Sequence, residues 1–386
     1  MPTVFLFLAA LSLLIWIALT FFRGAFWQVR RFNADLAAPD LPTVWPKVLA
    51  IVPARNEAET IARVVESILK QTFPGEYRLI VVDDHSEDST ASLAEQSAHF
   101  AGAAARLNIV SATALPTGWT GKLWALQQGV ENGAAFAADY LWLTDADIVH
   151  TPDTLERLVA RAGKQKLDLT SLMVLLQAKS FAERSLIPAF LYFFLMLYPP
   201  KWIADRQAKT AGAAGGCMLL RREALERIGG LTAIRSEVID DCALARALKR
   251  SGGAIWMGLA RKSVSLRAYS SFREIRDLIA RTAFTQLRYS SLVLIGTLLG
   301  MLLTYIVPVV FAFNTSPILW RIGLADWALM TISYLPTVRF YGLSPLWAPT
   351  LPLAAAFYSY ATWVSALRFW LGKGGQWKGR AQAPKK

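Results

Sequence analysis

Hydrophobic and polar positions divide this chain into three zones. An uncharged apolar run occupies residues 4–22, a middle zone alternates short apolar runs with amphipathic segments, and long apolar stretches return from residue 292 onward. A helix needs about 20 apolar residues to cross a bilayer. The outer zones therefore predict membrane spans, and the middle zone predicts a folded domain.

In the middle zone, strand-like and helix-like patterns alternate. Short apolar, β-branched runs predict strands at 47–52, 77–82, 107–110, 139–144 and 167–176. Apolar residues at helical spacing predict helices at 57–71, 89–96, 121–132 and 152–162. This β-α-β-α order predicts an α/β fold in which a doubly wound parallel sheet carries helices on both faces.

One apolar stretch in the middle zone, residues 186–200, fits neither pattern. It is too short to span a bilayer comfortably. It predicts either a core helix or a helix that lies in the membrane interface. Because the chain is already anchored by its first zone, we favour the interface.

The N-terminal zone, residues 1–23, predicts an uncleaved transmembrane anchor. It lacks the basic start, short apolar core and small-residue cleavage site of a signal peptide. Arg23, Arg30 and Arg31 follow directly, and basic residues beside a span favour the cytoplasmic side. Residues 24–45 then predict a linker, so that the domain at 46–288 is expected in the cytoplasm.

The C-terminal zone predicts a membrane region at 289–372, followed by a basic tail at 373–386. Residues 292–313 and 346–371 are the expected spans. Residues 322–340 carry Asp326, Pro336 and Arg339, and a charge at the centre of a membrane helix is costly. We therefore expect 322–340 to lie in the interface or re-enter. The chain would then cross three times and end in the cytoplasm.

Composition narrows the function. The 386 residues are 54% hydrophobic and carry a formal net charge of +13. The basic residues accompany the membrane segments rather than a nucleic-acid-binding motif, so nucleic-acid binding is not expected. The two cysteines, Cys217 and Cys242, do not imply a disulfide framework, and we expect both to be small packing residues.

An acidic pair follows the predicted strand at 139–144. Asp145 and Asp147 are separated by one residue, and the carboxyl ends of strands are where open α/β sheets bind ligands. Two such carboxylates can hold a hard divalent cation that neutralises a diphosphate. Taken alone, such a pair is more often simply a solvated pair of aspartates in a loop. His150 is either a further metal ligand or a cap for the next helix.

Other motifs fall at neighbouring strand ends. The motif at residues 53–57 follows the first predicted strand, Asp84 follows the second, and Lys122 begins a predicted helix. A second acidic pair, Asp240-Asp241, precedes another helical pattern. Together these side chains offer carboxylates for a base or ribose, a cation-binding pair, and a basic group for phosphate. A nucleotide diphosphate with a divalent metal needs these parts.

In this order, the motifs resemble those of family 2 glycosyltransferases, the inverting GT-A class. The resemblance implies a GT-A domain flanked by N- and C-terminal transmembrane helices. It implies that Asp84 and the 53–57 loop bind the nucleotide and that Lys122 lies near the diphosphate and sugar. The nucleotide-binding residues of that loop are Pro53, Ala54, Arg55 and Glu57.

The resemblance also implies the chemistry. Asp145 and Asp147 hold a divalent cation, Mg²⁺ or Mn²⁺, and Asp145 also contacts the donor, a nucleotide-diphosphate sugar that we expect to be a UDP-sugar. Asp241 is the implied catalytic base, and Asp240 beside it can raise its proton affinity. Arg288 matches the arginine of the family's Q-x-x-R-W motif and contacts the diphosphate. The alternative for Arg288 is a structural role as a juxtamembrane anchor.

This motif departs from that of processive members, since Thr285 and Tyr289 replace its glutamine and tryptophan. The departure favours a single transfer to a lipid. The segment 116–122 and the whole layout resemble the hopanoid-associated glycosyltransferases, which implies transfer of a hexose or N-acetylhexosamine to a hydroxyl of a lipid, in a multi-pass protein of a bacterial-type inner membrane.

Three alternatives stay open. Ceramide-type or other glycolipid glycosyltransferases share a similar layout. A sugar nucleotidyltransferase would also bind a nucleotide diphosphate, but it needs neither the Asp240-Asp241 pair nor the spans. A non-catalytic membrane partner on the same scaffold would be expected to lack the base or the metal residues.

Overall fold

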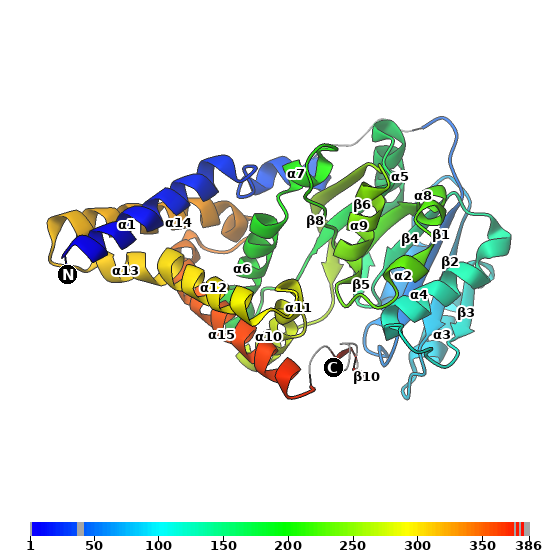
Figure 1. Ribbon diagram of the computed structural model, residues 1–386. Helices are drawn as coiled ribbons and strands as arrows, with labels where there is room; N and C mark the ends of the chain where they lie inside the picture. Colours follow the sequence, from blue (N-terminus) through cyan, green and yellow to red (C-terminus); the bar gives the residue numbers. More distant parts are fainter. Residues whose placement is uncertain (1, 37–41, 374–375, 378–379, 382–386) are drawn as a thin grey trace.

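The computed structural model describes residues 2–36, 42–373, 376–377 and 380–381. It consists of an α/β domain and an elongated arm of helices that projects from one side of it (Figure 1). Most of the predicted basic tail at 373–386, and residues 37–41 of the predicted linker, lie outside the described residues. The short strands β9, Gln376–Trp377, and β10, Arg380–Ala381, pair antiparallel.

The domain is built on one eight-stranded sheet in the order β3-β2-β1-β4-β7-β6-β8-β5. The strands are β1 Val48–Ala54, β2 Tyr77–Asp83, β3 Leu107–Ser111, β4 Tyr140–Thr144, β5 Ile148–His150, β6 Leu169–Leu175, β7 Cys217–Arg221 and β8 Ile255–Ser265. The five predicted strands are therefore present, and β5, β7 and β8 are additional.

The sheet is mixed rather than wholly parallel. β1 pairs in parallel with both β2 and β4, and β2 pairs in parallel with β3. β7 is antiparallel to β4 and to β6, and β5 is antiparallel to β8. The doubly wound parallel arrangement that the sequence predicts holds for β1–β4. The other half consists of the missed strands β5, β7 and β8 together with the predicted β6, which pairs in parallel with β8.

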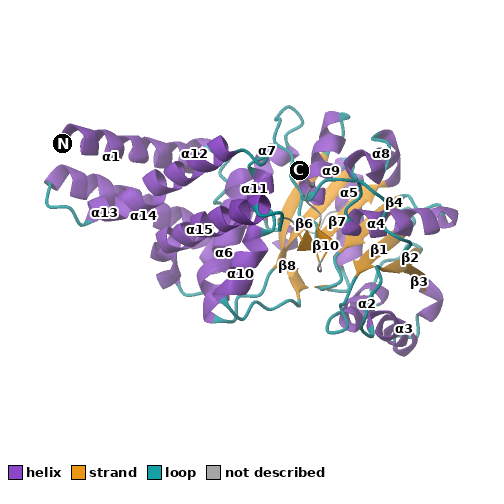
Figure 2. Cartoon of the chain, turned by 60° about the horizontal axis from the view of Figure 1, so that its bottom comes forward, coloured by secondary structure: helices purple, strands orange, loops and turns teal. Residues whose placement is uncertain are grey.

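Helices cover both faces of this sheet (Figure 2). In β1, Leu49 and Ile51 pack with α4, Gly121–Asn132, whereas Val48, Ala50 and Val52 pack with α2, Ile61–Leu69. This alternation is the two-residue period of a strand that is buried on both faces. The other helices of the domain are α3 Thr90–Phe100, α5 Thr154–Gln165, α7 Pro200–Ala204, α8 Arg222–Arg227 and α9 Asp240–Arg250.

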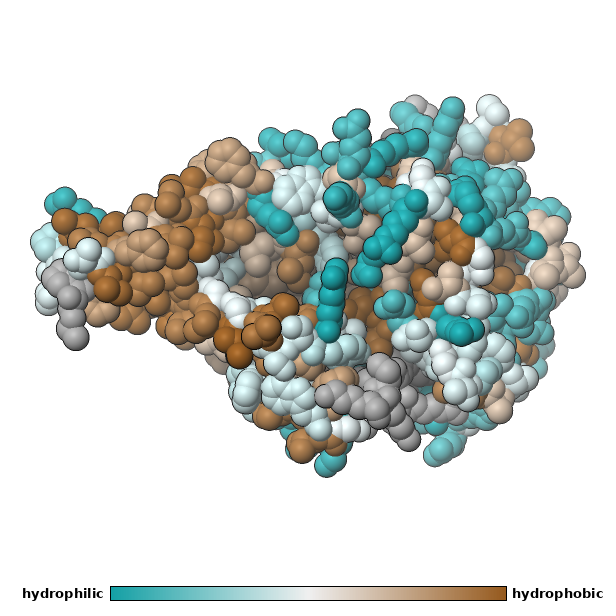
Figure 3. All heavy atoms as spheres, in the orientation of Figure 1, coloured by the Kyte–Doolittle hydropathy of each residue, from teal (hydrophilic) through white to brown (hydrophobic). Residues whose placement is uncertain are grey.

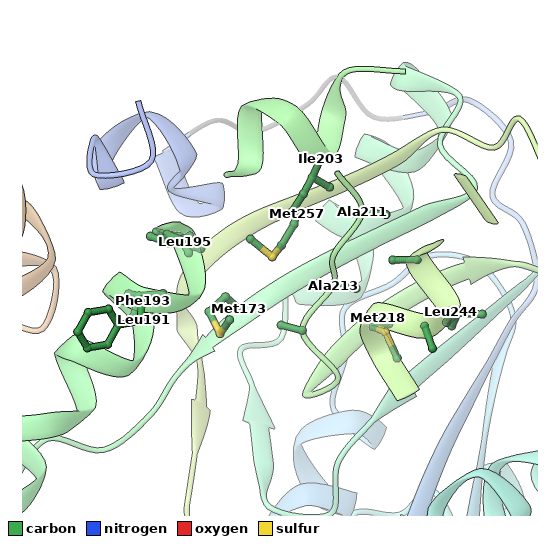
Figure 4. Packing of buried hydrophobic residues seen from close by; sticks show 14 of the residues in the cluster. Met173, Leu191, Phe193, Leu195, Ile203, Ala211, Ala213, Met218, Leu244 and Met257 are labelled. Carbon is green, nitrogen blue, oxygen red and sulfur yellow. The ribbon is translucent and has the colours of Figure 1, made fainter. Parts of the chain in front are cut away.

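The apolar stretch near 186–200 forms α6, Phe181–Leu197, and it is a core helix. Leu191 and Leu195 of α6 are almost completely buried, and α6 lies beside Met173 of β6 and Met257 of β8 (Figure 4). The preference for the membrane interface is therefore wrong. Helices from the C-terminal region cover the side of α6 that the sequence left without a partner.

The arm contains helices from both ends of the chain. α1, Pro2–Ile17, continues in a π-helical turn, Ala18–Phe22. The C-terminal helices are α10 Phe272–Ala280, α11 Ala283–Gln286, α12 Ser291–Met301, α13 Val307–Ala312, α14 Pro317–Phe340 and α15 Leu351–Trp370. A π-helical turn joins α12 to α13, and its Thr304 carbonyl accepts a hydrogen bond from Trp16 Nε1 at 2.7 Å.

Two helices of the described chain are long and apolar enough to cross a membrane, Thr3–Phe22 and Ser291–Ala312. Their apolar side chains colour the arm brown in Figure 3, while hydrophilic side chains gather over the domain. Neither the predicted span at 346–371 nor α14 meets the same criterion. Residues 322–340, which we expected to lie apart from the spans, belong to the continuous helix α14, which packs along α1 and α13.

Candidate active site

The carboxyl ends of β1 and β4 open into a cavity of about 410 Å³. Charged side chains line the wall that the sheet provides. These are Glu57, Lys122, Asp145, Asp147, Asp240 and Asp241. We call this set the charged wall. Helices also line the cavity with apolar side chains, Phe190 and Phe194 of α6 together with Leu278 of α10. We call these three residues the apolar wall.

Asp145 and Asp147 follow β4 directly, as the sequence predicts. Asp147 Oδ2 accepts a hydrogen bond from Ser265 Oγ at 2.9 Å, which fixes the carboxylate at the end of β8. Burial, and next the charge of Asp145, raise the pKa of Asp147. A raised pKa means that the site favours added positive charge, in the form of a proton or a cation.

Lys122 lies between the two acidic pairs. Its Nζ is 2.8 Å from Asp145 Oδ1 and 3.4 Å from Asp240 Oδ2. Burial alone would lower the pKa of this ammonium group, but Asp145 and Asp240 outweigh burial and raise it. Lys122 is therefore charged at neutral pH and lies where it can neutralise either a carboxylate or a bound phosphate.

Asp241 is held in the first turn of α9. The backbone N–H of Gly215 donates to Asp241 Oδ2 at 2.8 Å, and the N–H of Cys242 donates to Oδ1 at 2.7 Å. Burial, and next the charge of Asp240, raise the pKa of Asp241 to about 6. A carboxylate with this pKa is mostly ionised at neutral pH and is a stronger base than an exposed one.

The loop that presents Gly215 rests on Tyr198, the residue after α6. A Cβ added to Gly212 would lie 2.9 Å from the Tyr198 ring, so only glycine allows this close approach. The Tyr198 hydroxyl in turn pairs with the Gln286 side chain of α11. α6 and α11 thereby support the loop that holds Asp241.

The predicted nucleotide residues lie at the ends of β1 and β2. Pro53 and Glu57 line the cavity, whereas Ala54, Arg55 and Asp84 lie beside it. Arg55 donates to the Asp84 carbonyl at 2.6 Å, and its guanidinium is 3.9 Å from the buried Asp84 carboxylate. The two loops are therefore one connected surface.

Arg288 lies between α11 and α12, with φ +54°, and does not line the cavity as the described residues define it. Arg267 and Arg281 line it instead. Arg267 lies near Asp147 and Glu57, whose charges contribute to raising the pKa of the guanidinium against the effect of burial. Sequence reasoning missed both arginines.

His150 has no free nitrogen. Its Nε2 is 2.9 Å from Thr144 Oγ1, and its Nδ1 is 2.9 Å from Ser263 Oγ. Burial lowers the pKa of the imidazole to about 3. His150 is thus a neutral core residue, and the hypotheses of a metal ligand and of a helix cap are both wrong. Cys217 and Cys242 are buried and free, as expected.

The carboxylate oxygens of the site fit a divalent cation whose remaining coordination positions are filled by substrate oxygens. No cluster of three or more histidine, cysteine, aspartate or glutamate side chains suited to a metal occurs in the described part of the chain. Asp145 and Asp147 are nevertheless hard oxygen donors, and Mg²⁺ commonly takes one or two carboxylates plus substrate phosphates. The raised pKa of Asp147 agrees with a cation there.

The residues that sequence reasoning missed come from elements that it did not assign. Ser265 ends β8, Arg267 and Tyr269 follow it, and Leu278 and Arg281 belong to or follow α10. The run 255–265 carries a strand-like pattern that would have placed Ser265 at a strand end. No sequence signal places α10 against the cavity, because that contact depends on tertiary packing.

Comparison with known proteins agrees with this geometry. Residues 49–229 match the family model described as glycosyl transferase family 2. The matched segment includes the loops after β1 and β2, Lys122 and the Asp145–Asp147 pair, but ends before Asp240. Residues 49–229 are therefore similar to family 2 glycosyltransferases.

Two curated relatives are similar over part of their length. The chain is 31% identical over 118 residues to an undecaprenyl-phosphate 4-deoxy-4-formamido-L-arabinose transferase of Proteus mirabilis, covering 30% of this chain and 33% of the relative. It is 30% identical over 125 residues to glycosyltransferase AglE of Haloferax volcanii, covering 32% and 38%. The chain thus spans about a third of the length of these relatives.

Among solved structures, the mannosyltransferase PcManGT of Pyrobaculum calidifontis, in complex with GDP-Man and Mn²⁺, has a TM-score of 0.56 to this chain. The two are 18% identical, and the similarity covers 92% of this chain and 99% of that one. This similarity shows that the α/β fold is GT-A-like.

Proposed function

We propose that the chain is a membrane-bound inverting glycosyltransferase, which moves a sugar from a nucleotide-diphosphate sugar to a hydroxyl of a lipid acceptor. The observation that carries the proposal is the position of Asp241. Its half-buried carboxylate, with a raised pKa, lies in the same cavity as the Asp145–Asp147 pair. A base and a diphosphate site in one cavity are what direct displacement at a sugar carbon requires.

In the proposed reaction, Asp241 takes the proton of the acceptor hydroxyl. The resulting oxygen attacks the anomeric carbon, and the bond from that carbon to the diphosphate breaks. The nucleoside diphosphate leaves, and the transferred sugar has inverted configuration at its anomeric carbon. Lys122 neutralises charge that develops on the diphosphate. A divalent cation held by Asp145 and Asp147 would supply further stabilisation of that charge.

The finer assignments belong to the proposal too. The donor nucleotide is expected to be UDP, and the acceptor is expected to be a hopanoid, on the sequence resemblance described above. Arg288 stays a proposed diphosphate contact that would have to move toward the cavity when donor binds. The name of one relative refers to undecaprenyl phosphate. A phosphate acceptor needs no base, so the raised pKa of Asp241 in the cavity favours a hydroxyl acceptor.

The test is a transfer assay on the purified full chain in lipid vesicles, with UDP- and GDP-sugars as donors. Hopanoid polyols, ceramide and undecaprenyl phosphate are the acceptors, and the products are identified by mass spectrometry. Transfer to a hydroxyl lipid, with release of a nucleoside diphosphate, supports the proposal. Transfer to undecaprenyl phosphate alone, or release of free diphosphate, would contradict it.

A matched pair of variants separates the base from general damage. Asp241→Asn is nearly isosteric and removes the proton acceptor. Asp205→Asn changes the same residue type at an exposed position outside the cavity, where the side-chain oxygen can still accept from the Gln207 N–H. The first variant should lose transfer, and the second should retain it.

A further inference from the structure

The path of the C-terminal helices differs from the one that the sequence suggests. We infer that the chain crosses the bilayer through α1, through α12–α13 and through α14, and that residues 341–370 form a re-entrant hairpin that enters and leaves on the cytoplasmic side. This inference rests on the membrane setting of the proposed function, but its tests measure no activity.

α14 returns along the helix that precedes it. A Cβ added to Gly323 of α14 would lie 2.4 Å from the backbone nitrogen of Ala312 in α13, so the two backbones touch, as small residues permit in membrane helix pairs. Near the tip of the arm, Leu319 of α14 also packs with Ala9 of α1. At 24 residues, α14 is about 36 Å long, enough to cross a bilayer.

The charged residues of α14 do not face lipid at its centre. Asp326 is 1% exposed and faces the buried Ser12 of α1. Arg321 and Arg339 are exposed but lie near the two ends, where long side chains can reach the headgroups. The exposed residues between those ends are apolar, namely Leu324, Ala325, Ala328 and Ile332.

After α14 the chain turns back toward the tip of the arm. Gly342, at φ +70°, ends the helix, and the N–H of Leu343 donates to the Val338 carbonyl, a common helix-ending turn. Trp327 Nε1 then donates to the Pro349 carbonyl at 2.9 Å. Since Trp327 precedes the last helical residue by 13 positions, Pro349 lies about 20 Å along α14 from its end.

α15 begins at this depth and leads back toward the domain. Its exposed residues recur at helical spacing and form one outward stripe: Leu353, Ala356, Tyr360, Trp363, Leu367 and Trp370. The stripe is aliphatic at its deep end and contains Tyr and Trp toward its exit. Tyr and Trp are enriched at the membrane–water interface, so the stripe matches a helix that rises from the bilayer centre to the headgroups.

The hairpin also connects the bilayer to the cavity. Ser365 Oγ of α15 donates to the Ala280 carbonyl at the end of α10, and Arg368 pairs with Asp277 of α10. α10 supplies Leu278 of the apolar wall, and Arg281 follows it. The apolar wall is thereby held against the cytoplasmic leaflet, from which the acceptor lipid would be drawn.

Topology is tested by labelling single cysteines in the full chain, after Cys217→Ser and Cys242→Ser, with a membrane-impermeant thiol reagent. The sites are Ser316→Cys between α13 and α14, Ser344→Cys after α14, and Lys373→Cys after α15. We expect Ser316→Cys to react from the outer side, and the other two only in inverted vesicles. If Ser344→Cys reacts from outside or from neither side, or if Lys373→Cys reacts from outside, the inference is wrong.

Should the cysteine-free chain fail to fold, fusions of a phosphatase or a fluorescent protein after residues 316, 344 and 373 report the same sides. Depth is measured separately by spin labels at Leu353→Cys and Leu371→Cys. We expect the label at 353 to be deep, with high oxygen accessibility, and the label at 371 to be shallow. Equal, shallow depths would show that α15 lies along the surface and would overturn the re-entrant hairpin.

Discussion

The two walls of the cavity are built on different principles. The charged wall stands on strand ends and on the first turns of α4 and α9. The backbone N–H groups of Gly215 and Cys242 hold Asp241 there, and the Ser265 hydroxyl holds Asp147. The apolar wall is carried by α6 and α10, which contact each other and also pack against α15. One wall is fixed by the sheet, and the other by the arm.

This difference suggests a division of labour. A diphosphate and a metal need charges held at fixed positions, because electrostatic stabilisation depends on preorganisation. A lipid needs apolar surface and a route from the bilayer, and the helices that supply this surface are tied to α14 and α15. Changes in the charged wall should therefore lower turnover, whereas changes in the apolar wall should weaken acceptor binding.

The largest expected effect is at the base. Asp241→Asn removes the proton acceptor while leaving shape almost unchanged, so kcat should fall by about 10²–10⁴-fold. Binding of the nucleotide sugar, measured by calorimetry, should stay within about twofold. If Asp240→Asn abolishes sugar transfer while Asp241→Asn retains it, the assignment of the base to Asp241 is reversed.

Asp147→Asn should come next. Loss of one metal-binding carboxylate should reduce turnover by about 10²–10³-fold, a range typical for removal of one preorganised electrostatic contact. Binding of Mn²⁺ with nucleotide should weaken in parallel, as measured by electron paramagnetic resonance. Full activity of the parent chain in excess chelator would contradict the proposal that a metal binds at the charged wall.

The sequence predicted the charged wall much better than the apolar wall. Asp145, Asp147 and Lys122 belong to local motifs at strand ends or helix starts, so pattern brought them to one edge. The Asp240–Asp241 pair was added by the resemblance to the family. Phe194, Leu278 and Arg281 depend on how α6 and α10 pack, which no local pattern specifies. Of the missed strands, β8 carries a strand-like pattern that could have been assigned, whereas β5 has only three residues.

In the helical arm, too, local pattern failed where the outcome depends on tertiary packing. Sequence reasoning gave Asp326 the cost of a charge exposed at membrane depth, and partly on that ground it denied 322–340 a crossing. In the structure, Asp326 is turned inward against Ser12 of α1, and the exposed side of α14 between Arg321 and Arg339 is apolar. Burial by a helix more than 300 positions away cannot be read from a hydropathy pattern.

Lys122→Met should have a smaller effect than loss of either carboxylate, about 10–10²-fold on kcat, because it removes one of several positive contacts to the diphosphate. Lys122→Arg should recover part of the activity. Lys70→Met, at an exposed lysine paired with Glu66, is the matched control and should change nothing. Equal loss in both methionine variants would indicate instability instead, which a thermal melt would reveal.

The pH profile sharpens the role of Asp241. A general base acts only when ionised, so with a pKa of about 6 we expect kcat/KM to rise with pH and to level off above about pH 6–7. Asp240 raises this pKa, while Lys122 lowers it. Lys122→Met should therefore move the midpoint to higher pH. A flat profile from pH 5 to 8 would argue against Asp241 as the base.

The smallest expected effect concerns the apolar wall, and it tests the division of labour most directly. Phe194 is half-buried in the wall, so Phe194→Ala removes part of a ring's apolar contact, about 1 kcal/mol. That free energy corresponds to about fivefold in the KM for the lipid acceptor. The KM for the nucleotide sugar and the kcat at saturating lipid should stay near the parent values.

Phe100→Ala is the matched control for this substitution, because Phe100 is 91% exposed on α3, in the domain and away from the cavity. It should leave both KM values unchanged. If Phe194→Ala instead lowers kcat and leaves the acceptor KM alone, α6 acts mainly through Tyr198 and the loop that holds Asp241. The two walls would then be one mechanical unit, because the helix that contacts the lipid would also set the position of the base.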